Sequence, residues 1–175
     1  LATDDGYGDV DNVNGGGILN ESASTLTLKG VTISNNATSG GINSSGGGIH
    51  NSGTLAISKS ILSNSTISNN AASGGSGGVA GGAIYNNAGT LTIRATTLFN
   101  NIASGPNLGS GGAIMNNGNA MIEIRQSTIS NNTVSVQGAY GEGGGIFSNG
   151  TMTIIQSTIS NNAAQGTSGD GGGIF

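Results

Sequence analysis

The feature that most constrains this chain is a four-residue block, Gly-Gly-(Gly/Ala)-Ile, which recurs along nearly its whole length. The isoleucines of the block are Ile18, Ile49, Ile84, Ile114, Ile146 and Ile174. Intervals of about 30 residues are typical of repeat proteins, in which each repeat is one structural unit that stacks on its neighbours. The spacing therefore predicts one repeat domain, not a mixed globular fold.

A second block stands inside each interval, and its apolar residues alternate with polar ones. It reads TLTLKGVTISNN at 25–36, TLTIRATTLFNN at 90–101, MIEIRQSTISNN at 121–132 and TMTIIQSTISNN at 151–162. The stretch 54–70 is interpreted as the same block with five extra residues. A period of two predicts β-strands.

Each repeat thus predicts three short strands, GGGIxN, TLTI and STISNN, followed by a variable loop rich in Gly and Ser. No single strand buries its apolar side, but coils stacked about 4.8 Å apart would build one continuous core. The prediction is an all-β, right-handed parallel β-helix (β-solenoid) of about five to six coils of roughly 30 residues; its hand follows from general chirality.

Residues 1–14 are expected to form an acidic N-terminal lead or cap, and residues 15–175 one repeat domain that is open at its C-terminal end. Solenoid ends need polar caps. We therefore expect either end-to-end self-association into a head-to-tail filament or a longer parent chain.

Strand alternation assigns the side chains that face the core. The second strand points Leu26, Leu28, Leu55, Ile57, Leu91, Ile93, Ile122, Ile124, Met152 and Ile154 inward, and the third points Ile33, Ile67, Leu98, Ile129 and Ile159 inward. The same parity predicts a structural ladder of inward amides at a corner, formed by Asn35, Asn69, Asn100, Asn131 and Asn161. Stacked amides of this kind hydrogen-bond from coil to coil.

The charged residues exclude several partners. The chain has four Lys and Arg, eight Asp and Glu, and a net charge of -4, so no patch can neutralise several phosphates and no nucleic acid is expected. No apolar run is long enough to span a bilayer, and we expect no membrane insertion of this segment. The absence of cysteine excludes a disulfide scaffold.

An outward column follows the isoleucines of the repeated block: Leu19, His50, Tyr85, Met115, Phe147 and Phe175. Such a stripe either stacks sugar rings or is covered by a neighbouring chain or a loop. It is therefore a candidate ligand or assembly surface. His50 is interpreted as a member of this column and not as a catalyst or metal ligand.

Two further surfaces lie near the second strand. A basic row, Lys29, Lys59, Arg94 and Arg125, is a candidate site for an anionic glycan; the alternative is a solvated edge that Glu123 partly neutralises. Outward threonines, as in TLT at 25–27, form an array like that of ice-binding solenoids. That function is less favoured because Met121 and Glu123 interrupt the array.

Acidic residues offer little for catalysis. Glu142 and Asp170 each stand four residues before a GGGI isoleucine, without evident acid, base or nucleophile support. We therefore expect no catalytic residue and no enzyme, with a polysaccharide lyase or hydrolase as the alternative. An oxygen-rich N-terminal segment is a candidate Ca²⁺ site, or else a polar cap, and no other cofactor is expected; its carboxylates are Asp4, Asp5, Asp9 and Asp11.

The GGAI motifs at 81–84 and 111–114, with an aliphatic residue three positions before an asparagine in ISNN or LFNN, resemble the repeat of polymorphic outer membrane proteins. That family is marked by GGAI and FxxN, and the resemblance covers nearly the whole chain after Asn14. It implies an adhesive passenger β-helix of a bacterial autotransporter, with cell-surface glycans or host receptors as partners.

Together these observations predict a non-enzymatic, extracellular structural or adhesive β-helix of a bacterial cell surface. A polysaccharide-binding or polysaccharide-cleaving β-helix is the alternative.

Overall fold

The computed structural model describes residues 2–3, 13–39, 43–63, 66–67, 77–138 and 140–175 of the chain. Every regular element in these ranges is a β-strand, and every strand pairing is parallel. The described part of the chain contains no helix that could cross a membrane. The predicted β-solenoid is confirmed: five passes of the chain make about four turns of about 31 residues each.

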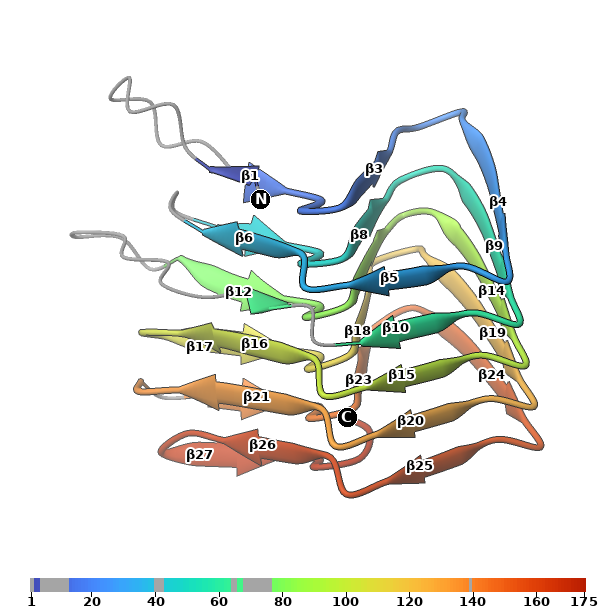
Figure 1. The fold of residues 1–175 in the computed structure, drawn as a ribbon. Helices are drawn as coiled ribbons and strands as arrows, with labels where there is room; N and C mark the ends of the chain where they lie inside the picture. The colour runs from blue at the N-terminus through green and yellow to red at the C-terminus, as the bar shows by residue number, and fades with distance from the viewer. Residues whose placement is uncertain (1, 4–12, 40–42, 64–65, 68–76, 139) are drawn as a thin grey trace.

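Three stacked sheets form the part of the molecule that we call the body (Figure 1). The first body sheet contains β3 (Ile18–Asn20), β8 (Ile49–Asn51), β13 (Ile84–Asn87), β18 (Ile114–Asn117) and β23 (Ile146–Ser148). The second contains β4 (Thr25–Lys29), β9 (Thr54–Ser58), β14 (Thr90–Arg94), β19 (Met121–Arg125) and β24 (Thr151–Ile155). The third contains β5 (Thr32–Ser34), β10 (Ile61–Ser63), β15 (Thr97–Phe99), β20 (Thr128–Ser130) and β25 (Thr158–Ser160). Coils are numbered one to five by their strand in the first body sheet.

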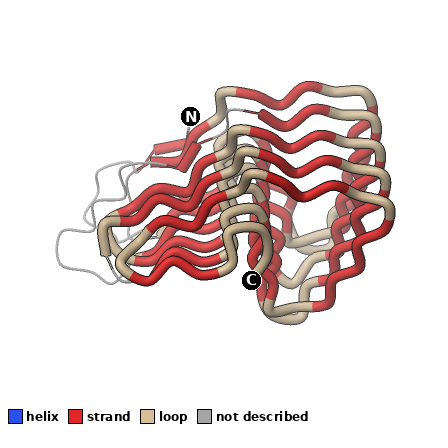
Figure 2. Tube along the Cα trace, turned by 90° about the horizontal axis from the view of Figure 1, so that it is seen from below, coloured by secondary structure: helices blue, strands red, loops and turns tan. Residues whose placement is uncertain are grey.

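Two further sheets form a thin double layer at one side of the body, which we call the wing (Figure 2). The outgoing wing sheet contains β1 (Ala2–Thr3), β6 (Ala37–Ser39), β11 (Thr66–Ile67), β16 (Ile102–Gly105), β21 (Thr133–Val136) and β26 (Ala163–Gln165). The returning sheet contains β2 (Val13–Asn14), β7 (Ser44–Ser45), β12 (Gly78–Ala80), β17 (Leu108–Ser110), β22 (Tyr140–Glu142) and β27 (Ser168–Asp170). The prediction of three strands and a loop was wrong, because the loop forms two more strands. Parts of the acidic lead, β1 and β2, belong to the wing as well.

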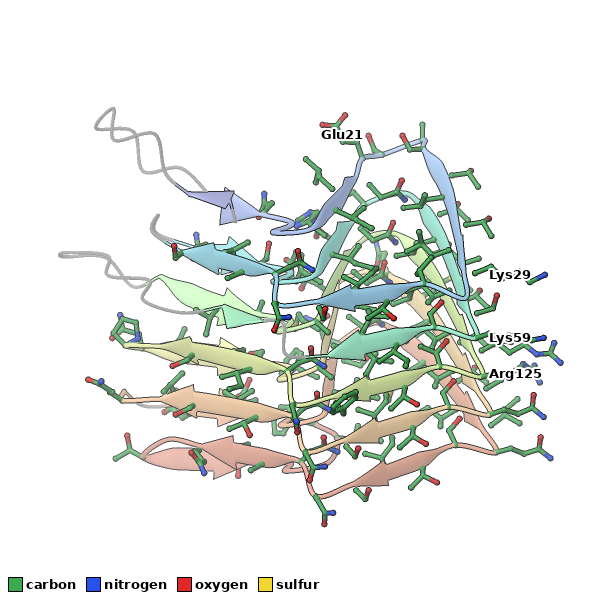
Figure 3. All side chains as sticks on the ribbon, in the orientation of Figure 1. Glu21, Lys29, Lys59 and Arg125 are labelled. Carbon is green, nitrogen blue, oxygen red and sulfur yellow. The ribbon has the colours of Figure 1, made fainter. Side chains whose placement is uncertain are left out.

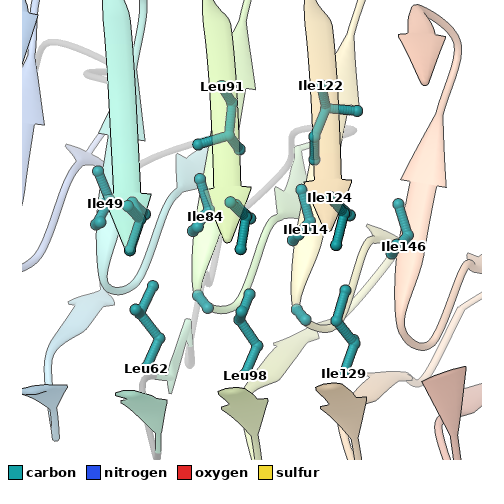
Figure 4. Close-up of a cluster of buried hydrophobic side chains, with 14 of the residues drawn as sticks. Ile49, Leu62, Ile84, Leu91, Leu98, Ile114, Ile122, Ile124, Ile129 and Ile146 are labelled. Atoms are coloured by element: carbon teal, nitrogen blue, oxygen red, sulfur yellow. The ribbon is translucent and has the colours of Figure 1, made fainter. Parts of the chain in front are cut away.

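The body is filled by aliphatic side chains that stack from coil to coil. Leu91 pairs in register with Leu55 and Ile122, and Ile93 pairs with Ile124, both completely buried. Figure 4 shows Leu91, Ile122 and Ile124 in this core. The predicted inward face of the second body strand is therefore confirmed. In the terminal coils the equivalent residues, Leu26, Leu28, Met152 and Ile154, are only partly buried.

In the third body strand, one predicted core residue was wrong. Leu62, not Ile67, pairs with Ile33 on one side and Leu98 on the other, whereas Ile67 belongs to the outgoing wing sheet and pairs with Ala103. The stretch 54–63 aligns with 25–34 without an insertion, so the extra residues do not interrupt this part of the block.

Glycines occupy the junction where the chain leaves the body for the wing and returns to it, which we call the neck. A Cβ atom on Gly112 would lie 2.7 Å from backbone atoms of Thr133, which is on the outgoing side of the same neck. Its neighbour Gly111 has a φ of 67°, a conformation in which glycine is favoured. The Gly-Gly pair of the repeat is therefore the part of the sequence that lets the two backbones cross closely.

The predicted asparagine ladder was wrong by one position. Asn35, Asn100, Asn131 and Asn161 are exposed and have φ values of 53–57°, while Asn69 lies outside the described residues. A residue in the left-handed region reverses the alternation of a strand, so the next asparagine turns inward instead. Asn101 Nδ2 donates to Asn132 Oδ1 and Asn132 Nδ2 to Asn162 Oδ1, both at 2.9 Å.

A second amide ladder, which the sequence did not predict, follows the first body sheet. Asn20, Asn51, Asn86 and Asn116 are joined by side-chain hydrogen bonds of 2.7–2.8 Å. Asn116 then donates to Ser148 Oγ at 3.0 Å. Buried amides that satisfy one another in this way fix the register of the coils.

A candidate ligand groove between wing and body

The predicted outward column is assembled by the pairing register of the first body sheet. Leu19 pairs with His50, His50 with Tyr85, Tyr85 with Met115 and Met115 with Phe147. The rings of Phe147 and Phe175 stack with centroids 5.5 Å apart. The alignment of these six residues, which we call the groove column, is therefore confirmed.

The groove column is less exposed than the sequence predicted. Leu19 and Phe175, at its two ends, are 51% and 49% exposed, but His50 is only 6% exposed and the three residues between it and Phe175 are half-buried. In the chain, each strand of the column follows a strand of the returning wing sheet, and residues of both sheets line the same hollow. The chain's own wing partly covers the stripe and turns it into one wall of a groove.

The opposite wall is a second column at the ends of the returning wing strands. Register places Asn14, Ser45, Ala80, Ser110, Glu142 and Asp170 in one row, which we call the wing column. Gly109 faces the other way, because a Cβ there would meet Val79 and Val134 inside the wing. The wing column therefore faces the groove, and all of its residues except Ala80 are polar.

The two walls enclose a hollow of about 370 Å³ at the second and third coils. Residues from both walls line it, among them Asn14, Ser45, His50, Tyr85, Asn87 and Ser110. Across the floor of the groove, Ser45 Oγ lies 3.0 Å from His50 Nδ1.

The hydrogen bonds of His50 argue against a serine nucleophile at this place. Ser45 donates its hydroxyl proton to Asn14 Oδ1 at 2.6 Å, so His50 Nδ1 donates to Ser45 Oγ and does not accept from it. His50 Nε2 then accepts from Ser52 Oγ at 3.2 Å. Burial lowers the pKa of His50, which favours the neutral imidazole that this network requires.

Tyr85 is the largest side chain that lines the hollow. Its ring lies against that of His50, with centroids 5.0 Å apart and a tilt of 48°. Asn117 Nδ2 donates to the Tyr85 hydroxyl at 2.9 Å and to Asn87 Oδ1 at 3.3 Å. Burial raises the pKa of Tyr85, and the hydrogen bond from Asn117 opposes that change. The phenol is thus a neutral donor whose position the next coil holds.

The two carboxylates of the wing column lie beyond the hollow. Glu142 and Asp170 pair in register on adjacent coils, which places them about 5 Å apart along the axis. Glu142 is partly buried and Asp170 is exposed. No group of three potential metal ligands occurs in the described ranges. The predicted Ca²⁺ ligands Asp4, Asp5, Asp9 and Asp11 lie outside them.

The predicted basic row lies at the corner between the second and third body sheets, away from the wing (Figure 3). Register links Lys29 to Arg94 through Ser58, and Arg94 to Arg125, but Lys59 stands one residue later, at the turn, with a φ of 50°. Arg125 is paired with Glu123, and its hydrogen bond lowers the pKa of that carboxyl. The row is therefore staggered and partly neutralised, as its solvated-edge interpretation requires.

The candidate site also contains wing residues that the sequence interpretation did not predict. Asn14, Ser45 and Ser110 face Tyr85 only because the supposed loop folds into strands, and the alternation in Thr-Val-Ser-Val at 133–136 was the available signal. Asn87 and Asn117 were marked by the doubled asparagines at 86–87 and 116–117.

Comparison of the chain with protein-family models, with curated proteins and with solved structures gives no match. The resemblance to polymorphic outer membrane repeats stays a prediction.

Proposed function

We propose that this chain is a non-enzymatic β-solenoid that binds a polysaccharide lengthwise in its groove, as an adhesive or structural element of a bacterial cell surface. One observation carries the proposal: the groove column, with His50, Tyr85, Met115 and Phe147 at its centre, continues in register from coil to coil, and at the second and third coils it shares a hollow with polar residues of the wing.

The chemistry of the two walls suits a sugar chain. Rings and thioether on one side offer apolar surface against the faces of sugar rings, and serines and asparagines on the other side offer neutral donors and acceptors. The coils repeat about every 4.8 Å, which is comparable to the length of one sugar unit. A linear polymer can therefore repeat its contacts from coil to coil.

The hydrogen bonding and exposure of the candidate catalytic residues in the groove favour binding over cleavage. Ser45 gives its proton to Asn14 and not to His50, and Asp170 is open to solvent. A glycosidase acid is usually held in a pocket that keeps it protonated. Glu142 and Asp170 nevertheless share the groove, so the assay below includes a test for cleavage.

The cell-surface location rests on the sequence resemblance and on the weakly charged, Asn- and Ser-rich composition. End-to-end self-association and a host receptor stay predictions, which electron microscopy and receptor-binding assays would test.

The proposal is tested by affinity electrophoresis of the whole chain in gels that contain soluble polysaccharides, with a reducing-end assay in parallel. Phe147→Ala should weaken retardation at least tenfold. The matched control is Phe99→Ala, which removes a half-buried outward ring from the third body sheet and should leave binding unchanged. Absence of retardation in every polymer would contradict polysaccharide binding, and release of reducing ends that Glu142→Gln abolishes would contradict the non-enzymatic assignment.

A further inference from the structure

We infer that the hollow at the second and third coils is the anchoring subsite of the groove and takes one neutral sugar residue. In this subsite Tyr85 contacts the sugar, and Asn117 acts as a positioning residue for Tyr85. The inference rests on the proposed function and names its ligand class.

The described residues that line the hollow are neutral. They are Asn14, Asn43, Ser44, Ser45, His50, Gly78, Val79, Ala80, Tyr85, Asn87 and Ser110. None carries a formal charge when His50 is neutral, and burial favours that form. A site of amides, hydroxyls and one ring face matches the hydroxyl groups and the apolar face of a sugar.

The hydrogen bonds around Tyr85 leave donors for a ligand. The phenol oxygen accepts the proton of Asn117 Nδ2, so the phenol proton is directed elsewhere. The same amide group occupies Asn87 Oδ1, which leaves Asn87 to offer its Nδ2 protons. Donors of this kind fit the ring and hydroxyl oxygens of an uncharged sugar.

The volume of the hollow limits the size of what it holds. About 370 Å³ is near the lower end of the range of roughly 300–1,000 Å³ for small-molecule sites. One sugar ring fits this space, and the rest of the polymer would follow the groove column toward Met115 and Phe147.

The surrounding charges disfavour an anionic sugar. On the wing column the next residue beyond Ser110 is Glu142, followed by Asp170, so a uronate in the groove would approach two carboxylates. The basic residues Lys29, Lys59 and Arg125 lie at the corner away from the wing (Figure 3). Like charges within about 10 Å repel appreciably at moderate salt.

The test compares neutral soluble β-glucan, galactan and mannan with the same three polymers oxidised at the primary alcohol to uronates. Oxidation keeps the backbone linkages and replaces each primary hydroxyl group by a carboxylate. At least one neutral polymer should be bound, and its oxidised form should bind at least tenfold more weakly at low salt. The difference should shrink as the salt concentration rises.

Variants of the whole chain locate the subsite. Tyr85→Ala should weaken binding of the neutral polymer more than tenfold, and Tyr85→Phe, which removes only the hydroxyl, about threefold to tenfold. Asn117→Ala should match Tyr85→Phe and add nothing in the double variant, a non-additivity that loss of stability alone would not produce. Asn119→Ala, which changes an exposed residue in the same turn, is the control and should bind as the parent does.

The outcomes separate this inference from the proposed function. If no polymer binds the parent chain, both are overturned. If a polymer binds and Phe147→Ala weakens it, but Tyr85→Ala does not or the oxidised form binds equally well, the groove assignment stands and the neutral anchoring subsite is overturned. Equal weakening by Asn117→Ala in the parent and in the Tyr85→Phe background would overturn the positioning role.

Discussion

The body and the wing are built from the same parallel ladders, yet they are filled differently. Large aliphatic side chains such as Leu91 and Ile124 fill the body, whereas the wing cluster consists, among the side chains that the structure describes, of Val79, Ala103, Val134 and Val136. Since the backbone pairing is alike, the difference lies in the apolar volume per coil. The body is built for stability, and the wing is a thin wall that turns a flat stripe into a groove.

This difference sets an order of stability within one chain. Full burial of a leucine or isoleucine side chain contributes about 1.5–3 kcal/mol, in proportion to the apolar area removed from water. The wing gains less from each coil, so we expect it to open before the body does. The neck, where the two parts meet, decides whether they remain together.

The largest effect is expected at the neck. Gly112→Ala would press a methyl group onto the Thr133 backbone, and we expect a loss of more than about 4 kcal/mol or failure to fold. Gly118→Ala is the matched control, because Gly118 has a φ of 64° but no atom within 4 Å of the added Cβ. Its cost should be about 1–2 kcal/mol. Urea unfolding followed by circular dichroism measures both, and equal costs would disprove a tight neck.

A smaller effect on the free energy of unfolding should distinguish the core of the body from the cluster in the wing. Ile93→Ala in the body should cost about 3–4 kcal/mol of unfolding free energy, from the range for buried isoleucine truncation. Val134→Ala in the wing removes less volume and should cost about 2 kcal/mol. Both side chains are completely buried, so the comparison does not depend on exposure. Hydrogen exchange should also show faster wing amides in Val134→Ala, and equal exchange in both parts would contradict the proposed order.

The corrected amide ladder gives the next prediction. Asn101→Ala removes hydrogen bonds to Asn132 and to the Leu62 carbonyl and takes a donor from these buried acceptors, at a cost of about 1–3 kcal/mol. Asn100→Gly changes the neighbouring exposed residue, whose φ is 54°, and glycine suits that conformation. Its unfolding free energy should therefore change little or rise slightly. If Asn100→Gly were instead more destabilising than Asn101→Ala in thermal or urea unfolding, the result would support the ladder predicted from strand alternation, in which Asn100 points inward.

The alternation of inward and outward residues predicted side-chain directions correctly only where a strand is regular. Leu91 and Ile93 were assigned correctly because five alternating residues lie in one strand. Asn100 was assigned wrongly because a single left-handed residue reverses the alternation, and no composition rule marks that residue in advance. Ile67 was misplaced because residues 61–70 contain two similar candidates, and only stacking against Ile33 and Leu98 selects Leu62.

The candidate site was predictable on one wall only. The groove column follows from the repeated isoleucines, whereas the wing column belongs to strands such as Leu-Gly-Ser at 108–110 and Ser-Gly-Asp at 168–170. Small and glycine-rich strands carry almost no periodic signal. They form because the strand edge of each coil pairs with the next coil. Their formation therefore depends on the stacked coils and not on the local sequence.

The smallest predicted effect concerns His50, which joins body and wing through Ser45. Burial lowers the pKa of His50 in the folded chain. In the unfolded chain His50 is protonated at about pH 6.5, whereas in the folded chain protonation requires a lower pH. Its contribution to stability is therefore complete above pH 6.5 and is lost as the pH falls toward the lower folded pKa.

His50 is the single histidine of the chain, so the urea midpoint should rise slightly as the pH increases from 5.5 to 7.5. His50→Gln, which keeps hydrogen-bonding groups at this position, should remove most of that slope. An unchanged slope would mean that carboxylates, not the contact between wing and body, set the response to acid.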